Sequence, residues 1–273
     1  HWRPLLYCWR GGQRSGALSL VLGQIGFRVT IIEGGYKAFR NAMLADLPAQ
    51  AQRLRYRVVC GPTGSGKTRL LHALQGAGAQ VLDLEGLAQH RASVLGLIPG
   101  QPQPSQKQFE MRVWDALRHF DASRPVYVEA ESKKVGNCTV PDALMQAMRA
   151  SHCLRVDLPD DERVALLLED YPFFITDPDF FCRRLDTLVA LRGRAVVDEW
   201  KQLVHSGQTP AVVRELLEKH YDPGYASSTR RNFAQFDGAL PVALPDRSHA
   251  SLEAACTAIL QQQGLGSMAA LST

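Results

Sequence analysis

The stretch that decides the fold is Gly61-Pro62-Thr63-Gly64-Ser65-Gly66-Lys67-Thr68, which directly follows an apolar run at 56–60. A G-x4-G-K-T sequence between a predicted strand and a predicted helix is a strong signal for a phosphate-binding loop. Its glycines let backbone amides wrap phosphate groups, Lys67 supplies positive charge, and Thr68 offers a hydroxyl to Mg²⁺. The motif does not distinguish a nucleoside triphosphate from another diphosphate ester. The predicted phosphate-binding residues are Gly61, Thr63, Gly64, Ser65, Gly66, Lys67 and Thr68.

Strands and helices alternate after this loop. The predicted strands lie at 57–60, 80–84, 125–129 and 153–156, and the predicted helices at 67–75, 107–120 and 141–150. Such alternation predicts a parallel sheet that is covered on both faces. Segment 98–105 is expected to be a loop, and 160–220 mainly helical with an interruption near 171–178. The predicted fold class is α/β, with a P-loop NTPase-like parallel domain at 56–273 that ends in a mainly helical region.

Acidic side chains end two of these predicted strands. Asp83 and Glu85 end the strand at 80–84, whereas Glu129 and Glu131 follow the strand at 125–129. Ligands of open α/β sheets bind at the carboxyl ends of the strands. We therefore expect these acids to orient Mg²⁺ or to act as acid or base, although the sequence establishes no metal site with certainty. Solvated charge at a helix N-terminus is the alternative interpretation.

A second anion-binding loop lies near the start of the chain, at Cys8-Trp9-Arg10-Gly11-Gly12-Gln13-Arg14-Ser15. Backbone N–H groups around the sulfur, a following helix N-terminus and a nearby arginine all favour a reactive thiolate. Five residues separate Cys8 from Arg14, which makes a nest wide enough for phosphate or a chalcogen-substituted phosphate. Cysteine-type phosphatases share this spacing, so the motif alone does not separate phosphatase from chalcogen transfer. The predicted oxyanion-binding residues are Arg10, Gly11, Gly12, Gln13, Arg14 and Ser15.

The chain of 273 residues has room for two domains. Strands are predicted at 5–7 and 29–32, helices at 15–25 and 36–47, and a domain boundary at the basic stretch 48–55. A parallel sheet of one or two strands cannot bury both faces, so we expect further sequence to precede His1. Residues 1–57 hold nine Lys/Arg against two acids, which favours a polyanionic partner such as nucleic acid.

The six cysteines show no close-set ligand spacing, which argues against a zinc site and a disulfide-stapled domain. Cys60, Cys153 and Cys182 are interpreted as core thiols. A reducing cytoplasm fits this pattern best. No apolar run approaches the roughly 18 residues that span a bilayer, and no signal peptide is visible.

These motifs together resemble the bacterial tRNA 2-selenouridine synthases, in which a rhodanese-like domain is fused to a P-loop domain. The resemblance rests on both loops, on the run 33–40, on Asp83-Leu84-Glu85-Gly86, and on His90-Arg91-Ala92-Ser93. Further matching segments are 103–107 and 129–136. At position 92 this chain has alanine, where the family pattern predicts glycine. Residues 1–47 would be the C-terminal part of the rhodanese-like domain.

The resemblance implies a chemistry in two steps on the 2-thiouridine of tRNA. Geranyl diphosphate first alkylates the sulfur, and selenium from selenophosphate then replaces the S-geranyl group. Cys8 would be the catalytic thiol of the selenium step, with selenophosphate in its loop and the geranyl donor's diphosphate in the loop 61–68. Residues with an implied substrate-binding role are His90, Arg91, Ser93 and Lys133.

Two alternatives stay open at this stage. One is an ATP-dependent kinase or NTPase fused to a cysteine-dependent phosphatase or sulfurtransferase domain. The other is a tRNA-binding protein without enzymatic activity. Turnover of ATP that tRNA stimulates would favour the first alternative over prenyl transfer.

Overall fold

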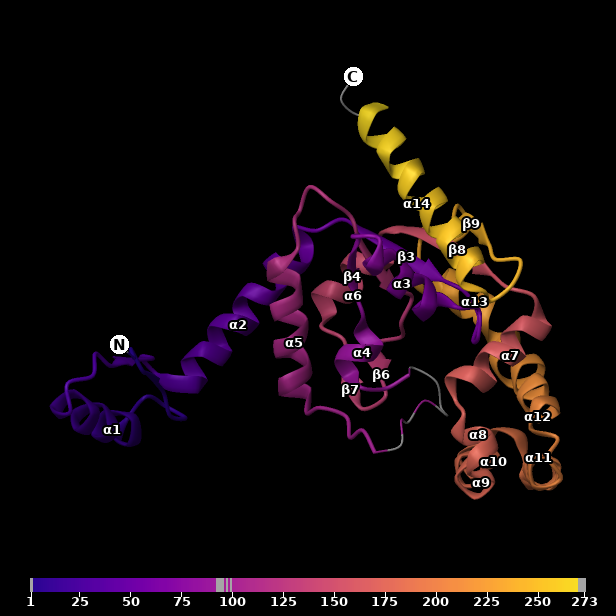
Figure 1. The fold of residues 1–273 in the computed structure, drawn as a ribbon, viewed down its shortest axis with the longest axis horizontal. Coiled ribbons are helices and arrows are strands. Elements are labelled where there is room, and N and C mark those ends of the chain that lie inside the picture. Colours follow the sequence, from indigo (N-terminus) through magenta and orange to yellow (C-terminus); the bar gives the residue numbers. More distant parts are fainter. Residues whose placement is uncertain (1, 92–95, 97, 99, 270–273) are drawn as a thin grey trace. The chain divides into compact units, whose positions relative to one another are not determined.

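The computed structural model describes residues 2–91, 96, 98 and 100–269 and divides into two compact units, His1–Arg53 and Leu54–Thr273. Figure 1 shows the elements of both units along the chain. Among the described residues, no helix combines the length and the apolar character that crossing a membrane requires.

The first unit contains β1 (Leu5–Leu6), α1 (Gln13–Gln24), β2 (Thr30–Ile31) and α2 (Gly35–Gln52). The two short strands pair in parallel, with Leu5 opposite Thr30. All four elements occur where the sequence predicts them, but α2 continues through Pro48 to Gln52, so most of the expected linker at 48–55 is helical. Proline lacks the backbone donor and is unfavourable inside a helix, yet α2 continues through it.

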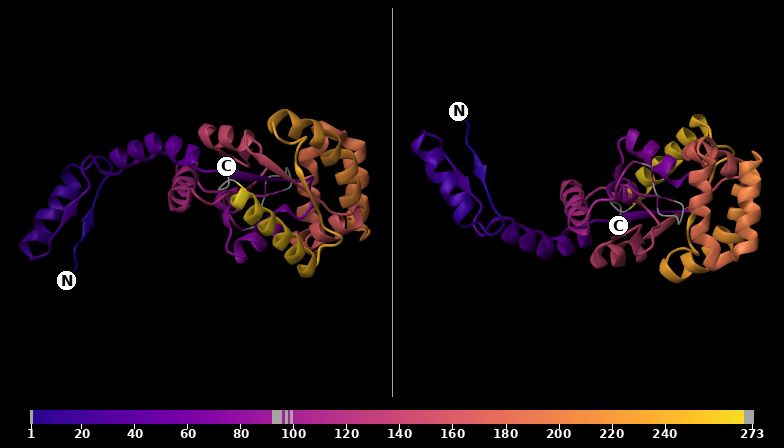
Figure 2. Two further views of the ribbon diagram at one scale, coloured as in Figure 1. Left: turned by 90° about the horizontal axis from the view of Figure 1, so that it is seen from above. Right: turned by 90° about the horizontal axis from the view of Figure 1, so that it is seen from below.

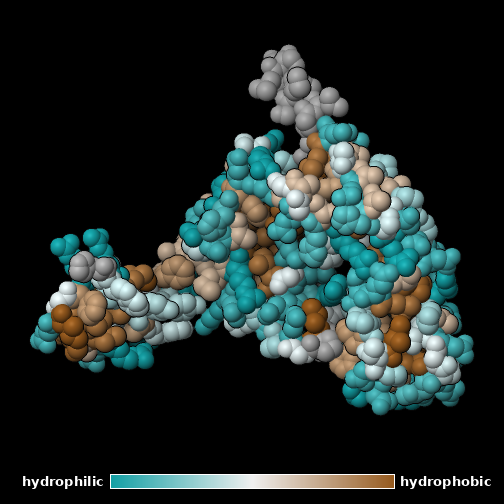
Figure 3. Space-filling view, in the orientation of Figure 1, coloured by the Kyte–Doolittle hydropathy of each residue, from teal (hydrophilic) through white to brown (hydrophobic). Residues whose placement is uncertain are grey.

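The first unit exposes many apolar side chains, which Figure 3 shows in brown. Leu18 and Val21 of α1 and Ile25 at its end are 49%, 53% and 65% exposed. The helical spacing at 15–25 predicted this helix correctly, whereas the burial that such spacing usually indicates is absent from these three positions. A two-stranded sheet offers too little surface to cover them.

The second unit is built on a sheet of five parallel strands in the order β4-β5-β3-β8-β9. The strands are β3 (Tyr56–Cys60), β4 (Gln80–Leu82), β5 (Val126–Glu129), β8 (His152–Asp157) and β9 (Leu240–Ala243). The predicted parallel α/β sheet is thus confirmed for this unit. The sequence did not reveal β9, because its proline and its largely exposed side chains are typical of an edge strand.

Helices cover this sheet, as the views of Figure 2 show. The main ones are α3 (Lys67–Gly76), α5 (Gln106–His119), α6 (Asp142–Arg149) and α14 (His249–Ala269). Side chains of α3 and α14 share one apolar core with the sheet, which includes Leu70, Leu74 and Leu252. Because β3 lies in the middle of the sheet, the loop that follows it is held between well-packed elements.

One predicted strand end is wrong. The strand expected at 80–84 stops at Leu82, and Asp83 caps a short helix α4 (Leu84–Ala88) by accepting a hydrogen bond of 2.7 Å from the Gly86 N–H. Aspartate is a preferred N-cap, and this local bond competes with the strand ladder. Two further strands, β6 (Lys134–Val135) and β7 (Cys138–Thr139), form a hairpin that the sequence did not predict.

The segment after β8 forms a helical layer around its own apolar core. It comprises α7 (Asp160–Asp170), α8 (Phe173–Thr176), α9 (Pro178–Leu185), η1 (Asp186–Leu188), α10 (Val189–Arg192), α11 (Arg194–His205), α12 (Thr209–Leu216), the π-helical turn η2 (Leu217–Tyr221) and α13 (Asp222–Asn232). Trp200 is fully buried at its centre, and Phe174 stacks on Phe181 with ring centroids 4.0 Å apart. The expected interruption near 171–178 is present, with the single turn α8 inside it.

Candidate functional site

The phosphate loop joins β3 to α3 in the arrangement that its sequence predicts. Gly64 and Gly66 have φ angles of +77° and +86°, which favour glycine over any residue with a Cβ. A Cβ on Gly64 would also lie 3.0 Å from Leu167 Cγ of α7. Lys67 Nζ donates hydrogen bonds to the carbonyl oxygens of Gly61 and Pro62, at 2.8 and 3.2 Å. The ammonium group is therefore held against the loop itself.

A cavity of about 520 Å³ opens beside this loop. All seven predicted phosphate-binding residues line it: Gly61, Thr63, Gly64, Ser65, Gly66, Lys67 and Thr68. The Ser65 side chain is fully buried, and its backbone N–H donates to the Pro62 carbonyl at 3.2 Å. Ser65 thus shapes the loop.

Three glutamates converge at this cavity. Ligand oxygens of Glu85, Glu129 and Glu131 lie within 4.8 Å of one another, and Thr68 Oγ1 donates to Glu85 Oε2 at 3.5 Å. Glu129 and Glu131 are only 2% and 6% exposed. Burial raises the pKa of Glu131 well above its usual value, and the neighbouring carboxylates raise it further, whereas Lys67 lowers it.

Asp83, the fourth predicted acid, is not part of this cluster. Its carboxylate caps α4, and His72 Nε2 lies 3.4 Å from its second oxygen. Asp83 is also absent from the described residues that line the cavity. The acidic cluster is therefore formed by α4 and by the residues at and just after the end of β5.

Arg163 of α7 anchors the tip of the phosphate loop. Its side chain is 5% exposed, and its Nε and Nη2 donate to the Thr63 carbonyl at 3.0 and 2.8 Å. Nη2 and Nη1 also bind the Asp222 carboxylate at 2.7 and 3.0 Å, and Nη1 binds Asp160 at 2.9 Å. One guanidinium thus joins the loop to the start of α13.

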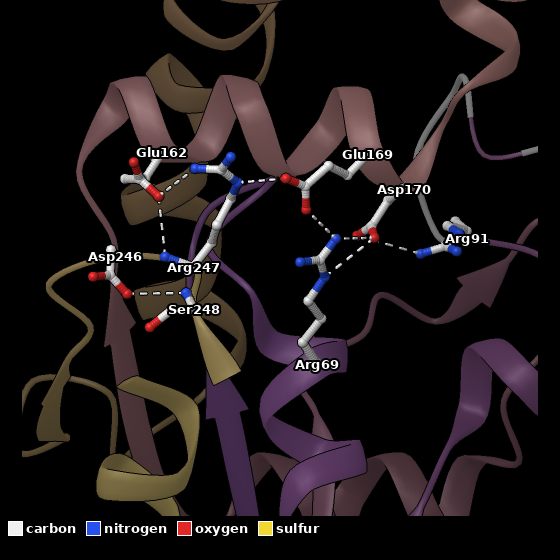
Figure 4. Close-up of polar contacts among 8 residues, drawn as sticks. All are labelled: Arg69, Arg91, Glu162, Glu169, Asp170, Asp246, Arg247 and Ser248. Carbon is white, nitrogen blue, oxygen red and sulfur yellow. Dashed lines mark hydrogen bonds and ion pairs between the residues drawn. The ribbon is translucent and has the colours of Figure 1, made fainter. Parts of the chain in front are cut away.

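A network of ion pairs ties α3 to α7 at the edge of the cavity, as Figure 4 shows. Arg69 Nη2 contacts Glu169 and Asp170 at 3.0 and 2.7 Å. Asp170 also lies 3.8 Å from Arg91, whose guanidinium sits 5.1 Å from the centre of the Tyr171 ring. Arg247 bridges Glu169 and Glu162. Asp170 thus orients two cavity-lining arginines.

Apolar and aromatic side chains form another wall of the cavity. They are Leu166, Leu167, Tyr171, Tyr221, Tyr225 and Phe233. Tyr171 and Phe233 are 7% and 4% exposed. Burial is the main cause that raises the pKa of Tyr225, so its hydroxyl stays protonated at neutral pH.

The other predicted substrate-binding residues lie in different settings. Arg91 lines the cavity, whereas His90 is 8% exposed and burial lowers its pKa, with the Arg184 charge adding to the effect. Lys133 forms an exposed ion pair with Asp142 at 3.0 Å. Ser93 lies outside the described residues, as does Ala92.

The cysteine loop in the first unit requires glycine at position 11. Gly11 has a φ angle of +64°, and a Cβ there would come within 2.6 Å of the Gly35 nitrogen. Tyr36 and Lys37 donate backbone hydrogen bonds of 2.9 Å to the carbonyls of Cys8 and Trp9. The backbone around Cys8 is thus packed directly against the start of α2.

The loop around Cys8 favours its thiolate form. Its Sγ lies 3.4 Å from Ser15 Oγ, and this hydrogen bond is the main cause that lowers the pKa of Cys8 to about 6, with backbone N–H groups of the loop contributing. Ser15 Oγ also lies 3.1 Å from the Gly12 carbonyl. A thiolate cannot donate, so ionised Cys8 requires the Ser15 hydroxyl to turn from Gly12 to the sulfur.

Cys60, Cys153 and Cys182 are buried, as expected of core thiols.

Sequence reasoning missed the residues that the helical layer brings to the phosphate loop and its cavity. Arg163, Tyr221, Tyr225 and Phe233 come from α7, η2, α13 and the segment after it. No spacing motif marks them. A single signal existed in Asp222-Pro223-Gly224, where proline and glycine interrupt an otherwise helical pattern.

Comparisons with known proteins match much of this chain. A family profile described as "tRNA 2-selenouridine synthase AAA domain" matches residues 54–179. A tRNA 2-selenouridine synthase of Marinobacter nauticus is 38% identical over 174 residues, which is 63% of this chain and 46% of the relative. Those of Aeromonas salmonicida and Hahella chejuensis are 33% and 34% identical over 81% and 83% of this chain, and 66% of each relative.

The chain spans about half the length of the first relatives it matches, at 46% and 45% of their sequences. The two longer matches also extend well beyond the profile's 54–179. On these similarities, the chain belongs to the tRNA 2-selenouridine synthase family.

Proposed function

We propose that the chain is a transferase that converts 2-thiouridine of tRNA to 2-selenouridine through an S-geranylated intermediate. The observation that carries this proposal is the cavity in which a phosphate loop faces three clustered glutamates. The names of the relatives support the tRNA substrate. The cysteines show no disulfide-type spacing, which supports an activity in the cytoplasm.

In the proposed first step, the loop 61–68 holds the diphosphate of geranyl diphosphate. The C2 sulfur of the base attacks C1 of the geranyl chain, the C1–O bond breaks, and diphosphate leaves with its electron pair. Lys67 and the loop amides stabilise the negative charge that develops on the leaving group. The proton lost from N3 of the base passes to a carboxylate of the cluster.

The cavity also fits a divalent cation. Its donors are carboxylate and hydroxyl oxygens, which Mg²⁺ prefers, and Glu129 Oε1 is buried without a hydrogen-bond partner among the described residues. Glu85, Glu129, Glu131 and Thr68 would hold the ion. It would supply positive charge that neutralises the diphosphate.

In the proposed second step, the cysteine loop holds selenophosphate and Cys8 is the catalytic thiol. The low pKa of Cys8, at about 6, keeps most of the thiol ionised at neutral pH. Arg14 and the backbone of 11–15 would hold the oxyanion. At the nucleotide, the selenium of selenophosphate attacks C2, the C2–S bond breaks and geranyl thiol leaves; water then cleaves the P–Se bond, which releases phosphate and leaves selenium on C2.

The test is to incubate the chain with thiolated tRNA and geranyl diphosphate, add selenophosphate, and identify the nucleosides by mass spectrometry. We expect geranylated and then selenium-containing uridine. Cys8→Ser should keep prenylation and lose selenium incorporation. Absence of both products, together with ATP turnover that tRNA stimulates, would replace this proposal with the kinase or NTPase alternative. Binding of tRNA without either activity would support a binding protein.

A further inference from the structure

Three aromatic side chains form a row that begins in the cysteine loop. The ring centroid of Trp9 lies 5.3 Å from that of Tyr36, and the centroid of Tyr36 lies 6.4 Å from that of Phe39. Trp9 directly follows Cys8 in the chain. None of these three side chains has a part in the two proposed steps, although the first of them is the immediate neighbour of the catalytic thiol.

The backbone holds Trp9 in a fixed place. The Lys37 N–H donates to the Trp9 carbonyl oxygen at 2.9 Å, and the Tyr36 N–H donates to the Cys8 carbonyl oxygen at the same distance. A Cβ on Gly35 would lie 2.1 Å from the Cys8 carbonyl oxygen, so the start of α2 and the loop are in direct contact. The position of Trp9 is thus set by its backbone and does not depend on burial of its ring.

The Trp9 side chain presents aromatic surface to water. The residue is 49% exposed although its ring contacts Tyr36. Apolar surface gains free energy when a partner removes it from water. Aromatic side chains that are held in place and exposed are the surfaces on which proteins stack unpaired bases of single-stranded RNA.

Positive charge accompanies this aromatic surface. Residues 1–53 contain two acids, Glu33 and Asp46, against seven Lys/Arg, at positions 3, 10, 14, 28, 37, 40 and 53. Arg10, next to Trp9, and Lys37, at the start of α2, are both exposed. Cations of this kind bind the phosphates of a nucleic acid, whereas an aromatic ring between them accepts a base.

We propose that Trp9 is the platform on which an unpaired base of the RNA substrate stacks, with Arg10 and Lys37 on the flanking phosphates. This inference rests on the proposed function and assigns the place where the first unit holds the nucleotide. Consecutive Cα atoms are about 3.8 Å apart, so a base on this ring lies beside Cys8 and the oxyanion in its loop. Because every base has a π face, Trp9 contributes affinity and position rather than the choice of base.

The experiment compares two RNA hairpins by fluorescence anisotropy with the full chain at one salt concentration. One hairpin carries 2-thiouridine in its loop, and the other carries an abasic nucleotide at that position. The unmodified chain should bind the first about tenfold tighter, since stacking on an aromatic side chain favours binding by about 5- to 150-fold for each base. Trp9→Ala should remove this preference, and Trp9→Phe should restore most of it. A preference that persists in Trp9→Ala would overturn the proposal.

The matched control is Trp2→Ala, because Trp2 belongs to the same unit, is 83% exposed and lies outside the cysteine loop. It should keep the preference, and an equal loss there would refute a specific platform at Trp9. In Trp9→Ala the pH profile of Cys8 alkylation by iodoacetamide should stay unchanged; a shifted profile would mean that Trp9 shapes the loop, which contradicts the proposal.

Two results with the unmodified chain separate this inference from the proposed function. Equal binding of the two hairpins would refute the stacking platform and leave the proposed function standing. Binding of neither hairpin would instead contradict the RNA substrate of the proposed function.

Discussion

Arg163 offers the sharpest test of how the phosphate loop is held. Arg163→Met keeps an apolar stem of similar length but removes the five hydrogen bonds to Thr63, Asp222 and Asp160. Asp222 then stays near the loop without its counter-charge, and the Thr63 carbonyl loses both donors. We expect the second unit to lose stability and the loop to lose order.

The expected loss of unfolding free energy follows from how exposed Arg163 and its acidic partners are. Removing one partner of a buried ion pair costs about 3–5 kcal/mol of unfolding free energy. Arg163 is 5% exposed but Asp222 is 33% exposed and keeps some contact with water, so the lower end, about 3 kcal/mol, applies here. Asp160 is 72% exposed and adds little. For a domain of this size the loss corresponds to a melting-temperature decrease of about 6–12 °C.

Calorimetric unfolding of the full chain measures this effect on the transition of the second unit. The matched control is Arg214→Met, because Arg214 pairs with Asp161 while the two side chains are 42% and 86% exposed. That substitution should cost less than about 1 kcal/mol. Pyrophosphate affinity should fall by about tenfold in Arg163→Met. Binding must then order the loop, and the entropy lost in doing so reduces the binding free energy.

A double-mutant cycle with Asp222→Asn separates a lost ion pair from lost packing. In the double variant no uncompensated carboxylate remains, so part of the stability should return, with a coupling energy of about 1–3 kcal/mol. Purely additive effects would refute the argument. An Arg163→Met melting temperature equal to that of Arg214→Met would refute it as well.

Three further predictions concern the two loops. Ser15→Ala should raise the pKa of Cys8 from about 6 toward the usual thiol value. Alkylation by iodoacetamide should therefore slow at pH 6–7, while the rate above pH 9 changes little. Equal pH profiles in both proteins would show that Ser15 does not lower the pKa of Cys8. Lys67→Ala should abolish prenylation and weaken pyrophosphate binding by about a hundredfold in calorimetry, and unchanged binding would place the diphosphate elsewhere. Gly64→Ala should lower stability by about 1–3 kcal/mol in thermal unfolding, because its φ angle is +77° and α7 leaves no room for a methyl group.

The pH effect on Cys8 has a definite sign. A depressed thiol pKa means that the folded loop favours the thiolate, so this contribution to stability is present above the ordinary thiol pKa and is lost as the pH falls through about 6. Removing the Ser15 hydroxyl raises the lower end of the pH range in which Cys8 is a thiolate. Reactivity at neutral pH should therefore respond to the substitution much more than reactivity in alkali.

The parts of the site that sequence predicted are those that local chemistry determines. The phosphate loop was predictable because glycines that can adopt positive φ, as Gly64 and Gly66 do, followed by lysine at a set spacing, are typical of phosphate binding between a strand and a helix. Glu85, Glu129 and Glu131 were expected to orient Mg²⁺ or to act as acid or base because they follow predicted strands, but the sequence did not predict that Glu85 would lie on α4 and meet the other two. Asp83 was misassigned because an aspartate after a strand serves equally well as a helix N-cap.

The residues that escaped prediction act across long stretches of chain. Arg163 binds Thr63 from 100 positions away and Asp222 from 59 positions away. Nothing in a local pattern distinguishes this arginine from a solvated one. The roles of Tyr221 and Tyr225 depend equally on how the helical layer packs, because an aromatic at helical spacing usually indicates a core position.

The helix α7 explains why the loop motif alone is an incomplete description of this site. Arg163, Leu166, Leu167 and Asp170 are spaced three and four residues apart and share one face of the helix. Arg163 holds the loop tip, the two leucines pack within 3.0–3.6 Å of positions where Gly64 and Gly66 would carry a Cβ, and Asp170 orients two arginines of the cavity. A disturbance of the helical layer therefore reaches the phosphate site through packed and hydrogen-bonded atoms. Conversely, a ligand that orders the loop stabilises the start of α13, since Thr63 and Asp222 are bound to the same guanidinium.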